Sequence, residues 1–228
     1  MKAGLVLSLF PGIGLLDRAF EEEGFCVVRG PDLLWGGDIH RFAPPSGVFQ
    51  GIIGGPPCQC FSPIGNVNRA RYGADAVARD LIPEFRRVVA AASPDWWLME
   101  NSPYAYSPFE GAYRLILDTA WLGERQARRR AFWSSLRLLP RVPALVSTDA
   151  GTRRAVGSRG TVDWAGSRRR EGPCSLEDVL ELQGLPRDYL RAAPFTRQAG
   201  MRAVGNGVPL PMGRVVACAV REALEAAP

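Results

Sequence analysis

Lysine and histidine are almost absent from this sequence of 228 residues. Lys2 is the only lysine among the 28 Lys and Arg residues, and His40 is the only histidine. No CxxC pair occurs among the five cysteines, which are Cys26, Cys58, Cys60, Cys174 and Cys218. Because a zinc site needs about four cysteine or histidine ligands at characteristic spacings, the sequence argues against a metal-binding protein.

Long hydrophobic runs are also missing. The longest apolar run near the amino end, AGLVLSLF at residues 3–10, is far shorter than the roughly 20 residues that span a bilayer, and it lacks the cleavage-site pattern of a signal peptide. We therefore expect no membrane partner and a cytoplasmic location, where thiols stay reduced. Residues two positions apart in a strand, such as Cys58 and Cys60, are also poor disulfide partners. Two interpretations remain for Cys58, a nucleophile or an inert small residue.

Positive charge is the main compositional feature, with a formal net charge of +5. A basic protein attracts acidic partners such as nucleic acids. Abundant arginine can also reflect a GC-rich genome, so the positions of the arginines are more informative than their number.

Apolar runs alternate with amphipathic segments along the chain. We predict strands at 3–10, 25–32, 48–53, 94–100 and 128–138, and helices at 15–23, 79–93, 112–123, 175–183 and 213–227. Ser175 is the expected N-cap of the fourth helix, although Asp178 stands where a capping box prefers Glu or Gln. Alternating strands and helices predict an α/β fold with a mostly parallel sheet.

Three of these strands end in residues that can support chemistry. A glycine turn at 12–14 follows the first strand, and Cys58 and Glu100 follow or close two others. Ligands bind beyond the carboxyl ends of parallel strands, so we expect all three to face one crevice. Pro56 and Pro57 stiffen the loop before Cys58 and fix the direction of its thiol.

The segment RQARRR at 125–130 has polar residues on alternate positions. A strand would direct Gln126, Arg128 and Arg130 to one face. A thiol, a carboxylate and guanidinium groups together suit attack on an electron-poor heterocycle.

In order along the chain, these blocks resemble the motifs of DNA cytosine-5 methyltransferases. LSLFPGIG resembles the S-adenosylmethionine loop, GGPPCQCFS the catalytic loop, MENSP the ENV motif, RQARRR the QxRxR motif, LEDVLELQGLP the late recognition-side motif and GNGVP the terminal GNxV. The resemblance implies a Rossmann-like S-adenosylmethionine-dependent methyltransferase sheet with helices on both faces and a small, reduced target-recognition region. We expect a catalytic and cofactor-binding domain at 1–139, the recognition region at 140–195 and a returning segment at 196–228.

The resemblance also implies how S-adenosylmethionine is held. The expected contacts are Phe10 against the adenine, Gly12 and Gly14 at the methionine end, Asp32 on the ribose, Asp38 at the adenine amino group and Asn206 on the methionine portion.

For the reaction, the resemblance implies a catalytic set of Cys58, Glu100, Arg128 and Arg130. Cys58 adds to carbon 6 of cytosine, Glu100 acts at N3 and the amino group, and Arg130 contacts the base carbonyl oxygen. Glu100 must carry or share a proton during this attack, which predicts a desolvated carboxyl with a raised pKa. The target carbon is hidden inside double-stranded DNA, so the base must be flipped out.

The recognition region departs most from the family. Only about forty residues separate Arg130 from the LQGLP helix, fewer than an independent domain usually has. The Gly-, Ser- and Arg-rich stretch 151–172 is either a DNA-contacting loop or a flexible charged loop. The residues expected to contact DNA are Gln126, Arg153, Arg154, Arg168, Arg169 and Arg170. Tyr104 and Tyr106, just after MENSP, are further candidates for DNA contact.

The compact size favours a phage or mobile-element enzyme, and the family resemblance implies a link to restriction-modification. Two alternatives remain open at this point, an RNA cytosine-5 methyltransferase and a non-catalytic module that binds nucleic acid or cofactor. The target sequence and the oligomeric state do not follow from the sequence.

Overall fold

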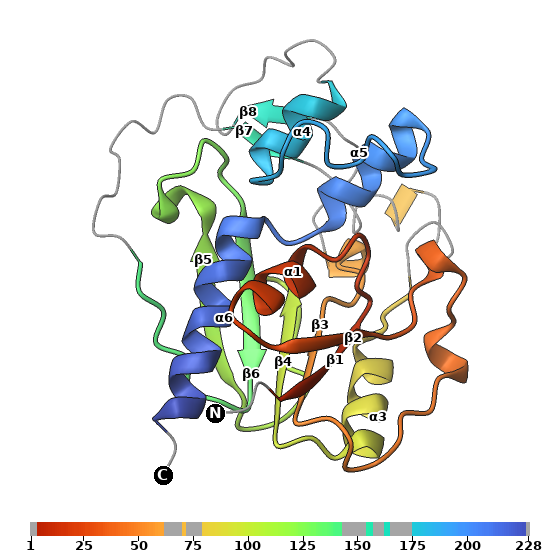
Figure 1. The fold of residues 1–228 in the computed structure, drawn as a ribbon, viewed down its shortest axis with the longest axis vertical. Coiled ribbons are helices and arrows are strands. Elements are labelled where there is room, and N and C mark those ends of the chain that lie inside the picture. The colour runs from red at the N-terminus through yellow and green to blue at the C-terminus, as the bar shows by residue number, and fades with distance from the viewer. Residues whose placement is uncertain are drawn as a thin grey trace.

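A six-stranded sheet with helices on both faces forms the body of the protein (Figure 1). The computed structural model describes residues 4–61, 70–71, 79–142, 154–156, 162–164 and 175–226. The strand order in the sheet is β2-β1-β3-β4-β6-β5. Its strands are β1 (Leu5–Leu9), β2 (Cys26–Arg29), β3 (Gly51–Gly54), β4 (Trp96–Asn101), β5 (Tyr113–Asp118) and β6 (Arg129–Ser134).

The first four strands are parallel to one another. Strand β6 runs antiparallel to β4, and β5, which pairs antiparallel with β6, runs in the same direction as the first four strands. From β1 the chain passes to β2 on one side and then returns to β3 on the other. This reversal creates a crevice at the carboxyl ends of β1 and β3, where ligands bind in open α/β sheets. The predicted α/β, Rossmann-like fold is therefore confirmed.

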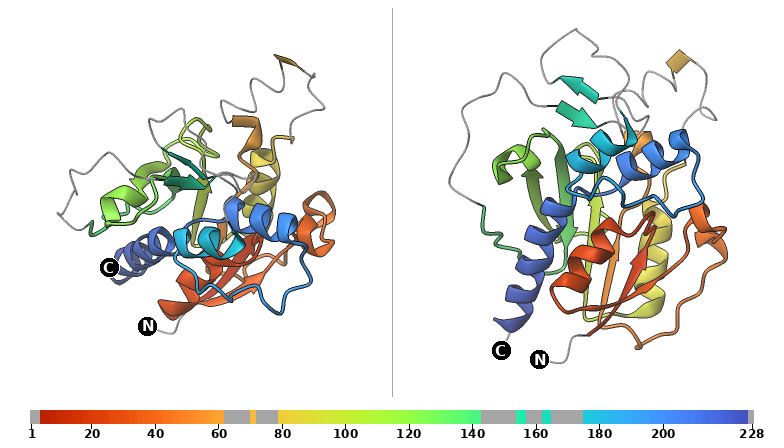
Figure 2. Two further views of the ribbon diagram at one scale, coloured as in Figure 1. Left: turned by 90° about the horizontal axis from the view of Figure 1, so that it is seen from above. Right: turned by 45° about the horizontal axis from the view of Figure 1, so that its top comes forward.

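Helices α1 (Leu15–Glu22) and α6 (Leu210–Glu225) cover one face of the sheet, and α3 (Ile82–Ala92) covers the other. Helices α4 (Leu176–Leu182) and α5 (Arg197–Asn206) lie beyond the carboxyl ends of the parallel strands (Figures 1 and 2). Short 3₁₀ turns are η1 (Leu33–Trp35), η2 (Ile39–Arg41), η3 (Gln59–Phe61) and η5 (Thr119–Leu122).

A separate antiparallel ribbon lies at the same end of the molecule as α4 (Figure 2). Its strands are β7 (Arg154–Val156) and β8 (Val162–Trp164). The ribbon occupies part of the stretch that the sequence predicted as a loop. Nearby, the capping box of α4 is complete, because the Ser175 hydroxyl accepts from the Asp178 N–H and the Asp178 carboxylate accepts from the Ser175 N–H.

The predicted helix over 112–123 is wrong. This segment forms strand β5 followed by the η5 turn. Six residue pairs, from Tyr113 opposite Ser134 to Asp118 opposite Arg129, join β5 to β6. The run YRLILD supplies aromatic and β-branched residues that suit a strand, and pairing with β6 overrides its weak helical pattern. Helix α5 was not predicted at all, because its sequence RQAGMRAVGN contains two glycines and has no clear apolar stripe.

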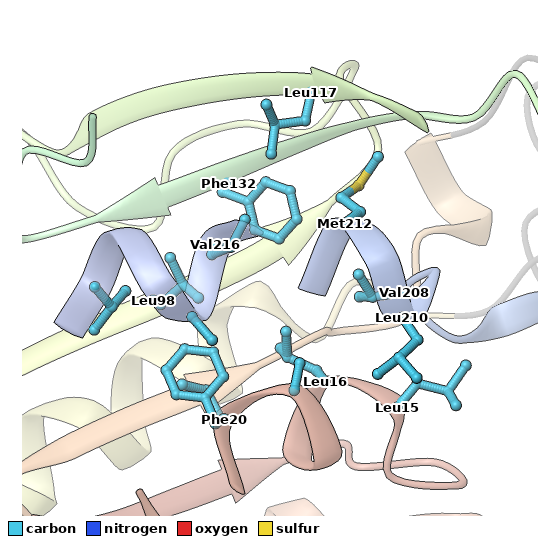
Figure 3. Packing of buried hydrophobic residues seen from close by; sticks show 14 of the residues in the cluster. Leu15, Leu16, Phe20, Leu98, Leu117, Phe132, Val208, Leu210, Met212 and Val216 are labelled. Atoms are coloured by element: carbon cyan, nitrogen blue, oxygen red, sulfur yellow. The ribbon is translucent and has the colours of Figure 1, made fainter. Parts of the chain in front are cut away.

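Two hydrophobic clusters hold the layers together. On the α1 and α6 side, Phe20 stacks on Trp96 with 6.1 Å between ring centroids, and Val216 of α6 packs towards Phe132 (Figure 3). On the α3 side, fully buried Phe85 packs against the opposite face of the sheet. The span 197–225 is long and apolar enough to cross a membrane by composition, yet 67% of its most apolar window is buried inside the protein, as expected of a core helix.

Gly51 provides a test of this packing. A Cβ atom built on Gly51 overlaps the indole ring of Trp96, which is only 2% exposed and cannot move aside freely. We predict that Gly51→Ala lowers the free energy of unfolding by about 1–3 kcal/mol, measured by urea denaturation. The matched control is Gly200→Ala in α5, where the added methyl group meets only the ends of flexible side chains, Leu176 at 3.3 Å and Leu190 at 3.6 Å. This control should be neutral or stabilising, since alanine favours helix. Equal stabilities of the two variants would contradict the packing described here.

Candidate active site

The carboxyl ends of β3 and β4 bring the predicted nucleophile loop and the predicted acid together. Gly54 of β3 pairs with Met99 of β4, so the loop leaves β3 beside Glu100. A Cβ atom built on Gly55 would lie 3.1 Å from Glu100 Oε2, so glycine lets the loop backbone approach the carboxylate. Cys58 follows three positions later and is partly exposed.

Hydrogen bonds hold the backbone on both sides of Cys58. Asn101 Nδ2 donates to the carbonyl oxygen of Pro56 at 3.0 Å, and the bond is buried. The Phe61 N–H donates to the carbonyl oxygen of Cys58 at 3.0 Å, which closes the η3 turn. Cys60 is 5% exposed, and its thiol lies 3.8 Å from the Pro57 carbonyl oxygen. Cys58 is therefore the accessible thiol of this loop.

Glu100 is buried at 7% exposure and forms an ion pair with Arg130, with 2.8 Å between Oε1 and Nε. Burial raises the pKa of the Glu100 carboxyl, and the charges of Arg130 and Arg128 oppose that rise. The net direction is the one that the sequence analysis expected. A raised pKa means that the neutral acid persists to higher pH than it would in water, so Glu100 is suited to holding a proton next to a substrate.

Arg128 does not share the orientation of Arg130. Its Nη2 donates to the carbonyl oxygens of Gly205 at 2.8 Å and Gly207 at 3.1 Å. These glycines flank Asn206, so a buried guanidinium fixes the turn that carries a predicted cofactor contact. Burial lowers the pKa of Arg128, and the nearby Glu100 and Cys58 act in the opposite direction. The structure thus places Arg128 as support for this turn, with its charge close to the predicted nucleophile.

The prediction that Gln126 contacts DNA needs correction. Gln126 is fully buried, and its Nε2 donates to the Leu182 carbonyl oxygen at 2.8 Å. The neighbouring Gln183 is also fully buried and donates to the Val204 carbonyl oxygen at 2.9 Å. A side chain enclosed in this way cannot reach a DNA surface unless α4 detaches. The alternation expected over 126–130 does not hold, because β6 begins only at Arg129 and Gln126 stands before it in an isolated bridge.

The predicted cofactor turn follows β1. Phe10 and Gly12 have positive φ angles of 56° and 57°, which is unusual for phenylalanine and indicates a tightly constrained turn. Asp32 accepts hydrogen bonds from the Gly12 N–H and the Leu34 N–H, both at 2.8 Å. Trp35 Nε1 donates to the Gly12 carbonyl oxygen at 2.7 Å. The sequence analysis missed Trp35, whose only signal was a tryptophan three residues after the predicted ribose acid.

The remaining predicted cofactor residues lie around the same edge. Gly14, with φ of 80°, is the N-cap of α1, and the Arg29 guanidinium fills the space that a Cβ would take. Asp38 caps η2 by accepting from the His40 N–H at 3.0 Å. Asn206 is exposed at the end of α5.

A buried carboxylate below the turn was also missed. Asp17 is fully buried, accepts a hydrogen bond from the Ser8 hydroxyl at 2.5 Å and pairs with Arg29 Nε at 3.0 Å. Burial raises the pKa of Asp17. Since Ser8 lies in β1 and Asp17 in α1, this contact fixes the angle between the strand and the helix that enclose the glycine turn.

Arg153, Arg168, Arg169 and Arg170 lie outside the described residues, and Arg154 is described only as part of β7. Among the residues that are described, no three His, Cys, Asp or Glu side chains gather closely enough to hold a metal ion.

The sequence profile described as C-5 cytosine-specific DNA methylase matches residues 36–118, which include Cys58 and Glu100. The type II methyltransferase M.AquIA of Picosynechococcus is 31% identical over 176 residues, covering 56% of this chain and 69% of that protein. The chain belongs to the C-5 cytosine-specific DNA methylase family. The type II methyltransferase M.NgoPII of Neisseria gonorrhoeae is also 31% identical, over 115 residues that cover 42% of this chain. Only 32% of the length of M.NgoPII is covered.

Solved structures of methyltransferases share the fold. A structure described as a DNA modification methyltransferase encoded within an E. coli prophage has a TM-score of 0.64 at 16% identity, covering 97% of this chain and 99% of that one. The Entamoeba histolytica methyltransferase EhMeth has a TM-score of 0.62 at 12% identity, with 98% of both chains covered. The fold shared with these methyltransferases therefore extends over nearly the whole chain.

The Arg128 contacts predict a role in holding the cofactor turn. Arg128→Lys keeps the charge but loses the planar fork that reaches both glycine carbonyls. We expect the affinity for S-adenosylhomocysteine, measured by isothermal titration, to fall about 5- to 30-fold, equivalent to one or two lost hydrogen bonds. Arg129→Lys is the matched control, because the exposed Arg129 side chain contacts only Trp121 and Asp118 among the described residues. Equal affinities of the two variants would refute a supporting role of Arg128.

Proposed function

We propose that this chain transfers a methyl group from S-adenosylmethionine to carbon 5 of cytosine in double-stranded DNA, through a covalent adduct with Cys58. The observation that carries the proposal is the buried Glu100–Arg130 pair beside the accessible Cys58 loop. Buried polar groups with a perturbed pKa next to an accessible thiol are typical of a catalytic site.

The residues present fit S-adenosylmethionine. Asp32 stands at the end of β2 with its carboxylate oriented by two backbone N–H groups, and such an acid suits a ribose diol. Gly12 has no atom within 4 Å of a built Cβ, so space is open above the turn. Phe10, Gly14, Asp38 and Asn206 complete the proposed contacts. When bound, the cofactor supplies an electrophilic methyl group on a sulfonium.

The chain's own residues account for activation of the base. The Cys58 thiolate adds to carbon 6 of a flipped cytosine, while the proton held by Glu100 moves towards N3. This addition makes carbon 5 electron-rich, and carbon 5 then accepts the methyl group. Loss of the carbon 5 proton to a base allows the Cys58 thiolate to leave by elimination. Arg130 holds Glu100 and contacts the base carbonyl oxygen, and the charge of Arg128 favours the thiolate.

For DNA recognition we propose the region 140–195, between a catalytic part at 1–139 and the returning segment 196–228. The net charge of +5 supports a nucleic-acid partner. Of this region, α4 is part of the body, because its buried residues Val179 and Leu180 join the α1 and α6 cluster. We therefore propose that the arginines of the stretch 151–172, and not α4, contact the target DNA. We place the protein in the cytoplasm, where DNA and a reduced thiol are both present.

Mechanism-based trapping tests the proposed function. DNA carrying 5-fluorocytosine at the target should form an adduct with the wild-type protein that survives a denaturing gel, because fluorine replaces the proton that must leave before elimination. The adduct should require S-adenosylmethionine. It should be lost in Cys58→Ala and retained in Cys60→Ala, since Cys60 is buried. Glu100→Gln should trap slowly, because it cannot deliver a proton to N3.

Methyl transfer by Cys58→Ala would contradict the proposed chemistry. Running the assay with labelled cofactor on duplex DNA and on RNA separates the two substrates, and methylation of RNA alone would replace DNA as the substrate. Bisulfite sequencing of the duplex then gives the target.

The arginine cluster predicts salt-dependent binding. We expect Arg168→Ala, Arg169→Ala and Arg170→Ala together to weaken DNA binding and to flatten the dependence of log K on log salt, because fewer counterions are released. Fluorescence anisotropy at several salt concentrations measures both. An unchanged slope and affinity would show that these arginines do not contact phosphates.

A further inference from the structure

Tyr106 contacts two positions that are far apart in the sequence. Its hydroxyl donates to Asp80 Oδ2 at 2.5 Å. Its ring packs edge-on against Phe61, with 5.7 Å between centroids and 85° between ring planes. Phe61 closes the nucleophile loop, and Asp80 precedes α3. One side chain therefore joins the positions at which the chain leaves the Cys58 loop and enters α3.

Both partners of Tyr106 are themselves fixed. The Phe61 N–H donates to the Cys58 carbonyl oxygen at 3.0 Å, so the ring contact bears directly on the turn that carries the thiol. Asp80 Oδ1 accepts from the N–H of Ile82, the first residue of α3, at 2.9 Å. The Asp80 carboxylate is therefore a fixed hydrogen-bond acceptor for the Tyr106 hydroxyl.

The segment that carries Tyr106 is anchored to the sheet. It follows β4, where Asn101 donates to the Pro56 carbonyl oxygen at 3.0 Å. Arg114 Nη2 donates to the Pro103 carbonyl oxygen at 2.6 Å, and the Ala105 N–H donates to the Ser102 carbonyl oxygen at 3.0 Å. The nucleophile loop is thus held before Cys58, at Pro56, and after it, at Phe61, by residues of one segment.

The hydroxyl of Tyr106 remains a donor at physiological pH. Burial and the Asp80 carboxylate raise the pKa of Tyr106 to about 12. The hydrogen bond to Asp80 therefore persists across the range in which the enzyme would work.

We propose that Tyr106 is a positioning residue for the Cys58 thiol, which it fixes through Phe61 while Asp80 holds its hydroxyl. This inference rests on the proposed role of Cys58 as the nucleophile. It assigns Tyr106 to contacts within the protein, whereas the sequence analysis considered it as a DNA contact. Tyr104 is 71% exposed and Tyr106 45%, so the two tyrosines of this segment differ in accessibility.

The test compares Tyr106→Phe with Tyr104→Phe. Each change removes one hydroxyl from the same segment, but only Tyr106→Phe breaks the bond to Asp80. We expect Tyr106→Phe to lower the single-turnover rate of methyl transfer about tenfold, as for loss of one hydrogen bond to a charged group. The melting temperature and the affinity for S-adenosylhomocysteine should stay unchanged, and Tyr104→Phe should match the wild type in the single-turnover rate.

A second readout does not depend on methyl transfer. Alkylation of Cys58 by iodoacetamide, followed by mass spectrometry, reports the orientation and reactivity of the thiol in the free protein. Tyr106→Phe should change this rate at least threefold, and Tyr104→Phe should not. Asp80→Asn keeps an oxygen for the Ile82 N–H but replaces the charged acceptor of the Tyr106 hydroxyl with a neutral amide, so it should shift both readouts in the same direction as Tyr106→Phe and by less. The double variant should be no worse than Tyr106→Phe alone, because that change already removes the hydroxyl.

The outcomes separate the two proposals. If the wild type transfers no methyl group but Cys58 alkylation responds to Tyr106→Phe alone, the proposed function fails and the positioning contact stands. If the wild type is active and the two tyrosine variants behave alike in both readouts, the positioning role is overturned. A drop in melting temperature with an unchanged single-turnover rate would also overturn it, because Tyr106 would then be purely structural.

Discussion

The ion pair between Glu100 and Arg130 is the interaction on which the site depends. A carboxylate buried at a strand end is costly unless a cation accompanies it, and Arg130 supplies that cation from the start of the neighbouring antiparallel strand. Its position requires β6 to run against β4, which brings the beginning of one strand to the end of the other. The sheet topology and the chemistry of the site are therefore linked through one buried contact.

Glycine and proline then decide how closely the loops approach this pair. Gly55 lets the loop backbone pass beside the carboxylate, and the prolines that follow leave few conformations for the thiol. On the cofactor side, Phe10 adopts a positive φ angle that the surrounding hydrogen bonds of Gly12 enforce. Rigid turns at adjacent strand ends give a fixed spacing between the cofactor side and the nucleophile.

The sequence was most informative where residues stand at strand ends. The loop that carries Cys58 leaves its strand beside Glu100, as expected, because parallel strands bring their carboxyl ends to one edge. Sequence analysis failed where pairing between distant segments decides the secondary structure. The residues of β5, predicted as a helix, form a strand because they pair with β6. The expected shared face of Gln126, Arg128 and Arg130 also did not form, because acceptors from α4 and from the turn before α6 orient the Gln126 and Arg128 side chains. Trp35 and Asp17 carried no motif, so only the folded chain reveals their contacts.

The hydrogen bonds from Arg128 to Gly205 and Gly207 join two separate parts of the chain. The guanidinium belongs to the part before residue 142, and both of its carbonyl acceptors belong to the part after residue 175. Two fragments severed between these positions would reassemble through the apolar surfaces of α1 and α6, but a misregistered complex would leave a buried cation without its acceptors. The chain is thus suited to a split format in which the proposed activity appears only when both halves have docked in the native register.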